Sequence, residues 1–322
     1  MNKLIAVLFF LSVNSCIFSQ NKITDYQVFI GEYIDVDNGI EYIVLRKFKS
    51  FDDSIKYLVL NPSTLNSSVI FSSNVKQVSW HYLENKYKGT TYIKLRNYSN
   101  IQKRVLKNAG IQNIKVDDRY IITTDLCPSV NKFDYSFYED VYKEISYFAL
   151  NAGTSFTLPV AIAISGAWIK YHKDDLKWLL EMQKNKKLSI TWINHSYTHR
   201  YIRGRDLESN FLLIKGTDIS NEILKTEELM MEEGLDLSIY FRFPGLISNE
   251  SIYNQVIDYG LIPIGADSWI GKGQYPVEGS IVLVHTNGNE SKGLYRFQKW
   301  LKKNKDIFYV ESINNMMTRY FQ

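Results

Sequence analysis

The sequence is poor in cysteine, the residue that would allow covalent cross-links. Its 322 residues contain two cysteines, and only Cys127 lies in the body of the chain, since Cys16 falls in a leader-like N-terminus. A single cysteine cannot form an intrachain disulfide. Because 45% of the residues are hydrophobic and 22% are charged, an ordinary globular composition, we expect the hydrophobic core to supply the stability instead.

Long runs of one residue class are also missing. The 38 Lys and Arg are dispersed among 34 Asp and Glu, and the formal net charge is only +4, so we expect no nucleic-acid partner. Beyond the first residues, no stretch is apolar for long enough to form a transmembrane helix. No internal repeat or low-complexity segment stands out.

The N-terminus has the pattern of an export signal. Lys3 precedes the apolar run Leu4–Val13, which is too short to stay in a bilayer as a helix, and Ser19 closes a plausible cleavage site. We therefore predict a signal peptide over residues 1–19 and an exported protein, periplasmic or secreted. In the alternative interpretation, the residues before Cys16 form a lipoprotein signal and Cys16 carries a lipid anchor.

Residues 20–116 are predicted to form a β-rich region. Short runs of β-branched, aromatic and aliphatic residues recur there, separated by turn-forming residues: Ile40–Leu45, Ile55–Leu60, Ser68–Phe71 and Thr91–Leu95. The region contains no catalytic constellation. We interpret it as a small accessory domain, or an elaboration of the main one, whose role the sequence does not define.

Residues 117–322 alternate between strand and helix patterns. The predicted strands are Tyr120–Thr124, Val160–Ile164 and Leu188–Ile193, and the predicted helices are Ser136–Leu150, Asp174–Lys184 and Ser220–Glu233. Repeated β–α units predict a parallel sheet or barrel with helices outside. Chemistry is expected at the C-terminal ends of such strands.

Polar residues follow several of these strands. Asp125, His195 and His285 each come directly after a strand. His195 and His199 are four residues apart, so on a helical turn both imidazoles would lie on one face and could bind one cation. Taken singly, each residue is explained equally well as a turn, a cap or a structural hydrogen-bond partner.

The order of these residues resembles the polysaccharide deacetylase family, the NodB-type carbohydrate esterases of family 4. An Asp at a strand end is followed by His-Ser-x-x-His, Arg-x-Pro, Asp-x-Trp and Leu-x-His over residues 120–321, and the segment Gly279–His285 is the best match. The resemblance implies a distorted (β/α) barrel with its site at the C-terminal ends of the strands. It also implies a hydrolase that removes acetyl groups from an acetylated polysaccharide.

The resemblance further implies a role for each residue. His195 and His199 would hold a divalent metal, zinc or a similar cation. The catalytic group would be Asp125 as base, Arg242 bracing Asp125, Asp267 bracing Arg242, and His285 as general acid. The substrate would contact Trp269, Leu283 and Pro244, the first two lining a small apolar pocket for the acetyl methyl. An Asp and a His in different environments can hold the opposite protonation states that such hydrolysis requires.

The first motif departs from the family pattern. The family has Thr-Phe-Asp-Asp-Gly-Pro, whose second Asp binds the metal, whereas this chain has Leu126 at that position. In one hypothesis Asp125 binds the metal while serving as base, or water takes the missing position. In another, Cys127 supplies a thiolate, although we expect its side chain to point away from the metal. In the third, the protein is a catalytically inactive glycan-binding protein.

We expect an active hydrolase, because the other residues of the pattern are present together. Besides the inactive glycan-binding protein, a metal-dependent amidase acting on a non-sugar substrate is an alternative, since the family resemblance does not fix the acyl donor. The arginine motif also departs from the family, at Phe243 and Gly245, so the resemblance does not define the shape of the sugar groove.

Overall fold

The structure, a computed structural model, describes residues 22–101, 106–114, 119–151, 155–305 and 308–322. The predicted signal peptide and Cys16 lie outside these residues, as does the expected boundary between residues 116 and 117. No helix within the described ranges is both long enough and apolar enough to cross a bilayer.

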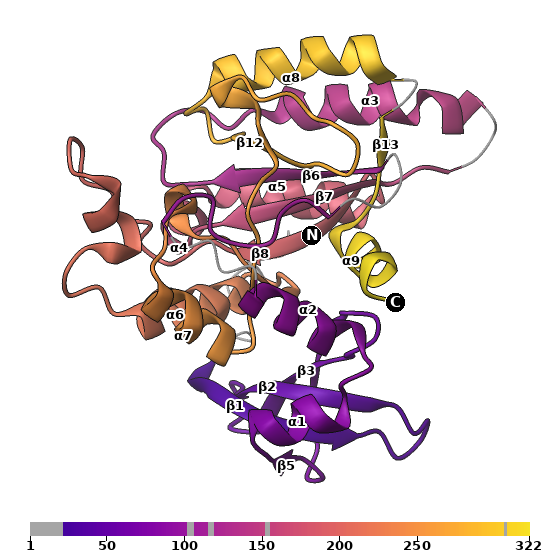
Figure 1. Cartoon of the computed structure of the whole chain (residues 1–322). Coiled ribbons are helices and arrows are strands. Elements are labelled where there is room, and N and C mark those ends of the chain that lie inside the picture. The colour runs from indigo at the N-terminus through magenta and orange to yellow at the C-terminus, as the bar shows by residue number, and fades with distance from the viewer. Residues whose placement is uncertain (1–21, 102–105, 115–118, 152–154, 306–307) are drawn as a thin grey trace, which may run out of the picture.

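A curled parallel sheet forms the centre of the molecule (Figure 1). Its strands lie in the order β10-β9-β8-β7-β6-β12-β11, and β13 pairs with β6 beside this path. The strands are β6 (Arg119–Leu126), β7 (Leu158–Ile164), β8 (Leu188–Asn194), β9 (Leu237–Phe241), β10 (Ile262–Pro263), β11 (Ser268–Trp269), β12 (Ile281–Val284) and β13 (Tyr309–Val310). All of their pairings are parallel. The sheet is a half-barrel, which confirms the predicted distorted (β/α) barrel.

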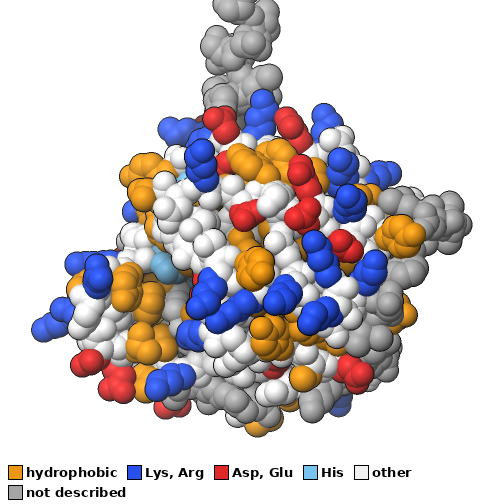
Figure 2. Space-filling view, turned by 90° about the horizontal axis from the view of Figure 1, so that it is seen from above, with side chains coloured by type: hydrophobic (Ala, Val, Ile, Leu, Met, Phe, Trp, Pro, Cys, Tyr) orange, Lys and Arg blue, Asp and Glu red, His pale blue; other side chains and the backbone are white. Residues whose placement is uncertain are grey.

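Helices cover the outer face of this sheet, with α3 and α8 side by side above it in Figure 1. The helices of this part of the chain are α3 (Tyr135–Asn151), α4 (Gly166–Tyr171), α5 (Lys173–Lys184), α6 (Ile219–Glu232), α7 (Glu250–Asp258), α8 (Ser291–Asn304) and α9 (Ile313–Phe321). Of these, α9 packs on the inner side, with Ala161 and Ala163. The predicted helices correspond to α3, α5 and α6 and are confirmed. Seen from above, the surface carries Lys and Arg intermixed with Asp and Glu, in keeping with the dispersed charge of the sequence (Figure 2).

The two faces of the sheet belong to different cores. On β7, Val160 and Ile162 pack in the outer core beneath the helices, whereas Ala161 and Ala163 pack in an inner core. Alternate residues of a strand point to opposite sides of the sheet, so an unbroken apolar strand can fill both cores at once. This double burial explains why the parallel strands were easy to recognise in the sequence.

A five-stranded antiparallel sheet precedes the half-barrel, which confirms a β-rich N-terminal region. Its order is β4-β3-β2-β1-β5, and its strands are β1 (Thr24–Ile34), β2 (Glu41–Lys49), β3 (Ile55–Leu60), β4 (Ser67–Ile70) and β5 (Lys76–Gln77). Helices α1 (Trp80–Lys86) and α2 (Thr91–Ile101) follow it. In Figure 1 this sheet lies below the half-barrel, with α2 and α9 between them.

The predicted strand at Thr91–Leu95 is wrong, because these residues form the start of α2. The run is rich in residues that favour strands, but packing decides otherwise. Tyr92, Arg96 and Ser99 are buried at the spacing of successive helical turns, and the Tyr92 hydroxyl donates to the Gly260 carbonyl at 2.8 Å. Tertiary burial of one helical face therefore overrides local β propensity.

The N-terminal sheet and the half-barrel share one core. Leu45 of β2 and Tyr92 of α2 belong to the inner core that also contains Ala161, Ala163 and Ile193. An ion pair between Arg46 and Glu227 of α6 adds to this contact, with 2.7 Å between Nε and Oε2 and both side chains almost fully buried. The N-terminal region thus covers the inner face of the half-barrel and leaves the C-terminal ends of its strands for the site.

Candidate metal and catalytic site

The C-terminal ends of β6, β8, β9 and β12 bring the singled-out polar residues together. Asp125 is near the end of β6, His195 follows β8, Arg242 follows β9, and His285 follows β12. Because these parallel strands are neighbours in one sheet, their ends meet at one edge. The arrangement is therefore a direct product of the sheet order.

Asp125 and Arg242 form a buried ion pair at the base of the site. Arg242 Nη1 lies 2.7 Å from Asp125 Oδ1, and the same nitrogen donates to the Thr123 hydroxyl at 2.7 Å. Burial alone would raise the pKa of Asp125, but Arg242, helped by His195 and His285, holds that pKa below its usual value. Asp125 is therefore ionised at neutral pH and can accept a proton.

Two backbone carbonyls brace Arg242. The carbonyl oxygens of Gly265 and Ile264 accept hydrogen bonds from Arg242 Nη2 and Nε, at 2.9 and 3.4 Å. The Asp267 carboxylate accepts hydrogen bonds from the backbone amides of Asn113 and Ile281, at 2.7 and 2.8 Å. These bonds tie the loop before β11 to Asn113 and to β12.

His195 and His199 lie on a loop rather than on a helical turn. Ser196 and His199 have positive φ angles of 66° and 45°, which no helix allows. The loop is pinned at Thr198, whose amide and hydroxyl donate to Glu222 of α6 at 2.9 and 2.6 Å. The two imidazoles nevertheless meet, with 4.7 Å between their ring centroids, so the sequence predicted their proximity for the wrong geometric reason.

Each of these histidines turns one ring nitrogen toward the site. His195 is fully buried, and its Nδ1 lies 2.8 Å from the carbonyl oxygen of Arg242, so Nδ1 must carry the proton and Nε2 has a free lone pair. His199 Nε2 is buried and has no hydrogen-bond partner among the described residues. A buried ring nitrogen without a partner is rare in folded proteins, and His199 Nε2 fits a metal ion. His195 Nε2 faces the same site, 3.5 Å from Cys127 Sγ and 3.6 Å from Asp125 Oδ2.

Cys127 faces the same two histidines, contrary to our expectation that its side chain points away. Its Sγ lies 3.5 Å from His195 Nε2. The expectation overlooked that residues two apart in an extended chain point to the same side, so Cys127 follows Asp125 while Leu126 is fully buried in the outer core. Burial opposes ionisation of this thiol, but His199, His195 and His285 together hold its pKa well below the usual value.

His285 lies against Trp269 and Glu290. Its ring stacks on Trp269 with 5.5 Å between centroids, and its Nδ1 lies 3.0 Å from Glu290 Oε2. Burial would lower the pKa of His285, but Cys127 and Glu290 outweigh it and raise that pKa to about 10. His285 is therefore protonated at neutral pH while Asp125 is ionised.

Glu290 is a site residue that the sequence did not reveal. Besides contacting His285, it accepts hydrogen bonds from Trp269 Nε1 at 3.0 and 3.1 Å. It lies immediately before α8, five residues beyond the Leu-x-His motif. Nothing in the local sequence marks it, because its role depends on a loop that turns back onto β12.

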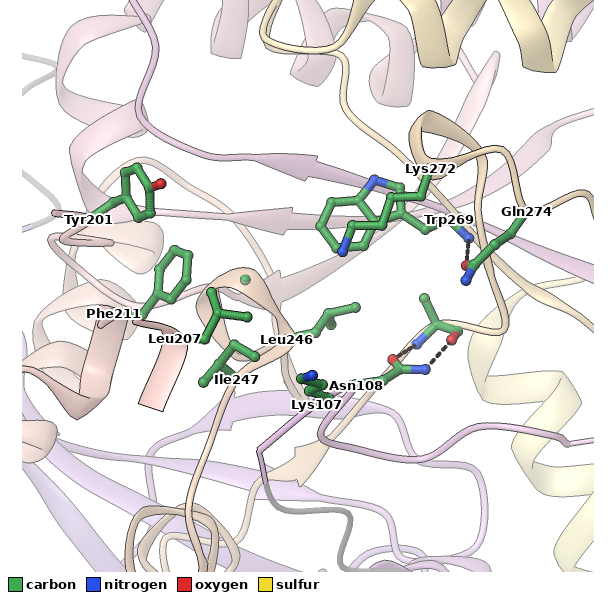
Figure 3. A pocket seen from close by; sticks show the side chains of 12 residues that line it. Lys107, Asn108, Tyr201, Leu207, Phe211, Leu246, Ile247, Trp269, Lys272 and Gln274 are labelled. Atoms are coloured by element: carbon green, nitrogen blue, oxygen red, sulfur yellow. Dashed lines mark hydrogen bonds between the residues drawn. The ribbon is translucent and has the colours of Figure 1, made fainter. Parts of the chain in front are cut away.

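Two adjoining cavities open above these residues. One, of about 520 Å³, is lined by Cys127, His199, His285, Glu290 and neighbouring side chains. The other, of about 580 Å³, includes Lys107 and Lys272 in its lining (Figure 3). Three aromatic residues line both cavities: Tyr201, Phe211 and Trp269.

The expected substrate residues take different places in this region. Trp269 lines both cavities, and Lys272 Nζ lies 3.5 Å above its ring. Leu283 is fully buried in a small apolar cluster with Leu246 and Ala266, against which Trp269 packs. Pro244 is buried at the start of a 3-10 turn (Pro244–Leu246) and does not belong to the lining of either cavity.

Gly245, which departs from the family motif, shapes the groove. Its φ is 64°, and a Cβ at this position would collide with the ring of Phe211. Glycine therefore allows the chain to turn and lets Phe211 lie between the two cavities.

No family model matches the sequence. Among solved structures, the chain is similar to a family 4 carbohydrate esterase from Bacillus anthracis, with 18% identity, 71% of this chain and 92% of that chain covered, and a TM-score of 0.45. It is also similar to the family 4 carbohydrate esterase PdaA from Bacillus subtilis, with 15% identity, 69% of this chain and 88% of that chain covered, and a TM-score of 0.47. A family 4 pseudoenzyme from Bacillus anthracis is similar with 13% identity, 64% of this chain and 67% of that chain covered, and a TM-score of 0.42. These proteins belong to the group that the motifs of this chain resemble, and at such low similarity we base the function on the geometry of the site.

Proposed function

We propose that this protein is a metal-dependent hydrolase that removes acetyl groups from an acetylated polysaccharide. One observation carries the proposal: Asp125, whose pKa is lowered, lies 3.6 Å from His195, and His285, whose pKa is raised, lines one cavity with Cys127 and His199 at the same strand ends. Hydrolysis of an amide or ester needs a proton acceptor for the attacking water and a proton donor for the leaving group. The site offers both at the same pH.

Asp125 is the proton acceptor in this proposal. Its Oδ1 is occupied by Arg242 Nη1, so Oδ2 is the oxygen that takes the proton from water. Arg242 itself is fully buried and is fixed by Thr123 and two carbonyl oxygens. The base is thus held in one orientation before substrate arrives, which lowers the cost of reaching the transition state.

His285 is the proton donor. Its Nδ1 is bound to Glu290, so its Nε2 delivers the proton to the departing amine or alkoxide. Stacking on Trp269 keeps the ring from rotating. Once neutral, His285 recovers its proton from solvent, because the raised pKa favours the protonated form.

His195 and His199 are suited to hold the divalent metal. Each offers a buried nitrogen directed into the site, and the Arg242 carbonyl fixes the tautomer of His195. A metal bound there would polarise the acetyl carbonyl and lower the pKa of a bound water toward neutrality.

The shape of the site supports a polymeric sugar substrate. Leu246 and Ala266, which line the second cavity with Trp269, offer an apolar surface to an acetyl methyl group, and Leu283 packs behind them. The second cavity extends the groove past Trp269, with room for a neighbouring sugar, and aromatic rings such as those of Tyr201 and Phe211 pack well on the faces of sugar rings. We also propose that the protein acts after export, as its N-terminus predicts.

A substrate panel tests this proposal. Purified protein would be incubated with N-acetylglucosamine oligomers, an O-acetylated xylan and simple acetamides, and released acetate would be measured with and without a chelator. Chelator-sensitive release from either glycan supports the proposal, whereas release only from the simple amides would favour a non-sugar amidase. Because Leu126 stands where the family has a metal-binding carboxylate, the second candidate is an inactive glycan-binding protein. Binding of a glycan without release of acetate would support this second candidate.

A further inference from the structure

We propose that the thiolate of Cys127 is the third protein ligand of this metal site, so that a zinc ion is held by one sulfur and two imidazole nitrogens. This inference deepens the proposed function, since it concerns the same site. In the family the third ligand is a carboxylate at the position that Leu126 occupies here. We place the third ligand at Cys127 instead, and it is a thiolate.

The distances between the three ligand atoms suit one tetrahedral ion. The Cys127 sulfur and one nitrogen each of His195 and His199 all lie within 4.8 Å of one another, and the sulfur is 3.5 Å from His195 Nε2. With zinc–sulfur bonds of about 2.3 Å and zinc–nitrogen bonds of about 2.0 Å, tetrahedral ligands stand roughly 3.3 to 3.6 Å apart. Only small shifts would close the cluster around an ion.

The three side chains are prepared for such an ion. The Arg242 carbonyl accepts a hydrogen bond from His195 Nδ1, which leaves Nε2 as an acceptor 3.5 Å from the Cys127 sulfur. His199 Nε2 is buried without a partner among the described residues. A cation between the three atoms satisfies all of them at once.

The backbone of β6 explains why Cys127 and not Leu126 reaches the site. Leu126 is fully buried among the apolar side chains of the outer core, where no polar residue could replace it cheaply. The next residue returns to the inner side, and its carbonyl accepts a hydrogen bond from Asn287 Nδ2 at 2.9 Å. Cys127 is thereby fixed next to the two histidines.

The ligand set predicts the metal and its chemistry. A thiolate with two imidazoles favours zinc, whereas magnesium and manganese prefer oxygen ligands. Three protein ligands leave a fourth position for water or substrate, which is the pattern of catalytic rather than structural zinc sites. Asp125, whose Oδ1 is bound by Arg242 and whose Oδ2 lies 3.6 Å from His195 Nε2, stands beside this ligand set as the base.

Cobalt spectroscopy tests the assignment without relying on activity. Metal-stripped protein would be titrated with Co²⁺, and bound Zn²⁺ would be quantified separately. We expect one ion per chain and a near-ultraviolet sulfur-to-cobalt charge-transfer band. In Cys127→Ser the band should vanish and zinc affinity should fall about tenfold or more. His81→Ala, which changes an exposed histidine of α1, is the matched control and should alter neither.

A second variant guards against misfolding of the first. Cys127→Asp restores a carboxylate ligand and should bind one ion without the charge-transfer band. A 1:1 cobalt complex of the native protein that lacks the band would overturn the assignment of Cys127, and so would a Cys127→Ser protein that keeps the band. Zinc-dependent acetate release without the band would refute this ligand but leave the proposed function standing. The charge-transfer band without acetate release would support Cys127 as a ligand but contradict the proposed function.

Discussion

The guanidinium of Arg242 lies 2.7 Å from the carboxylate of Asp125, and both side chains are almost completely removed from solvent. Two charges buried this deeply depend on each other, because neither can be hydrated when its partner is lost. The pair therefore has two functions: it keeps Asp125 ionised, and it links the ends of β6 and β9.

Arg242→Met should destabilise the protein substantially. The substitution leaves Asp125 as an unpaired buried charge, so the free energy of unfolding should fall by about 3–5 kcal/mol, measured by denaturant titration. The matched control is Lys49→Met, which breaks the exposed pair with Asp25 and should cost less than about 1 kcal/mol. An equal fall in the free energy of unfolding in the two variants would show that the buried pair stabilises the fold no more than the exposed pair does.

His285→Ala should abolish turnover while leaving the fold intact. Loss of a general acid typically reduces the rate by about 10² to 10⁴. Acetate release and circular dichroism would be compared with those of the native protein. A well-folded His285→Ala protein that retained its activity would refute His285 as the acid.

Glu290→Gln should shift the pH dependence of the reaction. The Glu290 carboxylate raises the pKa of His285 through its contact with Nδ1, and His285 must be protonated to act as the acid. Removing that negative charge lowers the pKa, so activity should be lost at a lower pH as the solution becomes more alkaline. The alkaline limb of kcat/KM against pH measures this directly, and an unmoved limb would contradict the assigned role of Glu290. Asp25→Asn, which removes an exposed carboxylate paired with Lys49 on the N-terminal sheet, is the control and should leave the limb in place.

The chain should unfold in one cooperative transition rather than two. The N-terminal sheet and the half-barrel share a core and the buried pair of Arg46 with Glu227, so neither part keeps its packing alone. Glu227→Gln should lower the stability of both parts together, by about 3–5 kcal/mol. Far-ultraviolet circular dichroism and tryptophan fluorescence should report the same denaturation midpoint. Two separated transitions would mean that the N-terminal region is an independent domain.

Much of the half-barrel could be predicted from the sequence, because its strands are buried on both faces and read as unbroken apolar runs. Asp125, His195 and His285 were found for the same reason, since each follows such a run at a strand end. The α2 helix was missed because burial by distant residues, rather than local propensity, decides its conformation. Glu290 and the bracing carbonyls of Ile264 and Gly265 could not be found, since loops bring them in and no residue pattern marks them.

The orientation of the Cys127 side chain could have been predicted from the sequence, although we expected the opposite. The period of two in an extended strand predicts that it shares a side with Asp125, and the structure agrees. In the family that the sequence resembles, the usual metal ligand stands at the position of Leu126 and not at that of Cys127. A departure from a motif is thus better judged together with the side-chain directions of its neighbours.

The central claim is that Asp125 and a metal at the histidines together hydrolyse an acetyl group. The most direct measurement is acetate release from N-acetylglucosamine oligomers by metal-stripped protein before and after zinc is restored, beside Asp125→Asn treated identically. We predict that zinc restores release in the native protein and not in Asp125→Asn. Release that persists in Asp125→Asn, or a folded, zinc-loaded native protein that releases no acetate from any acetylated glycan, would contradict this account.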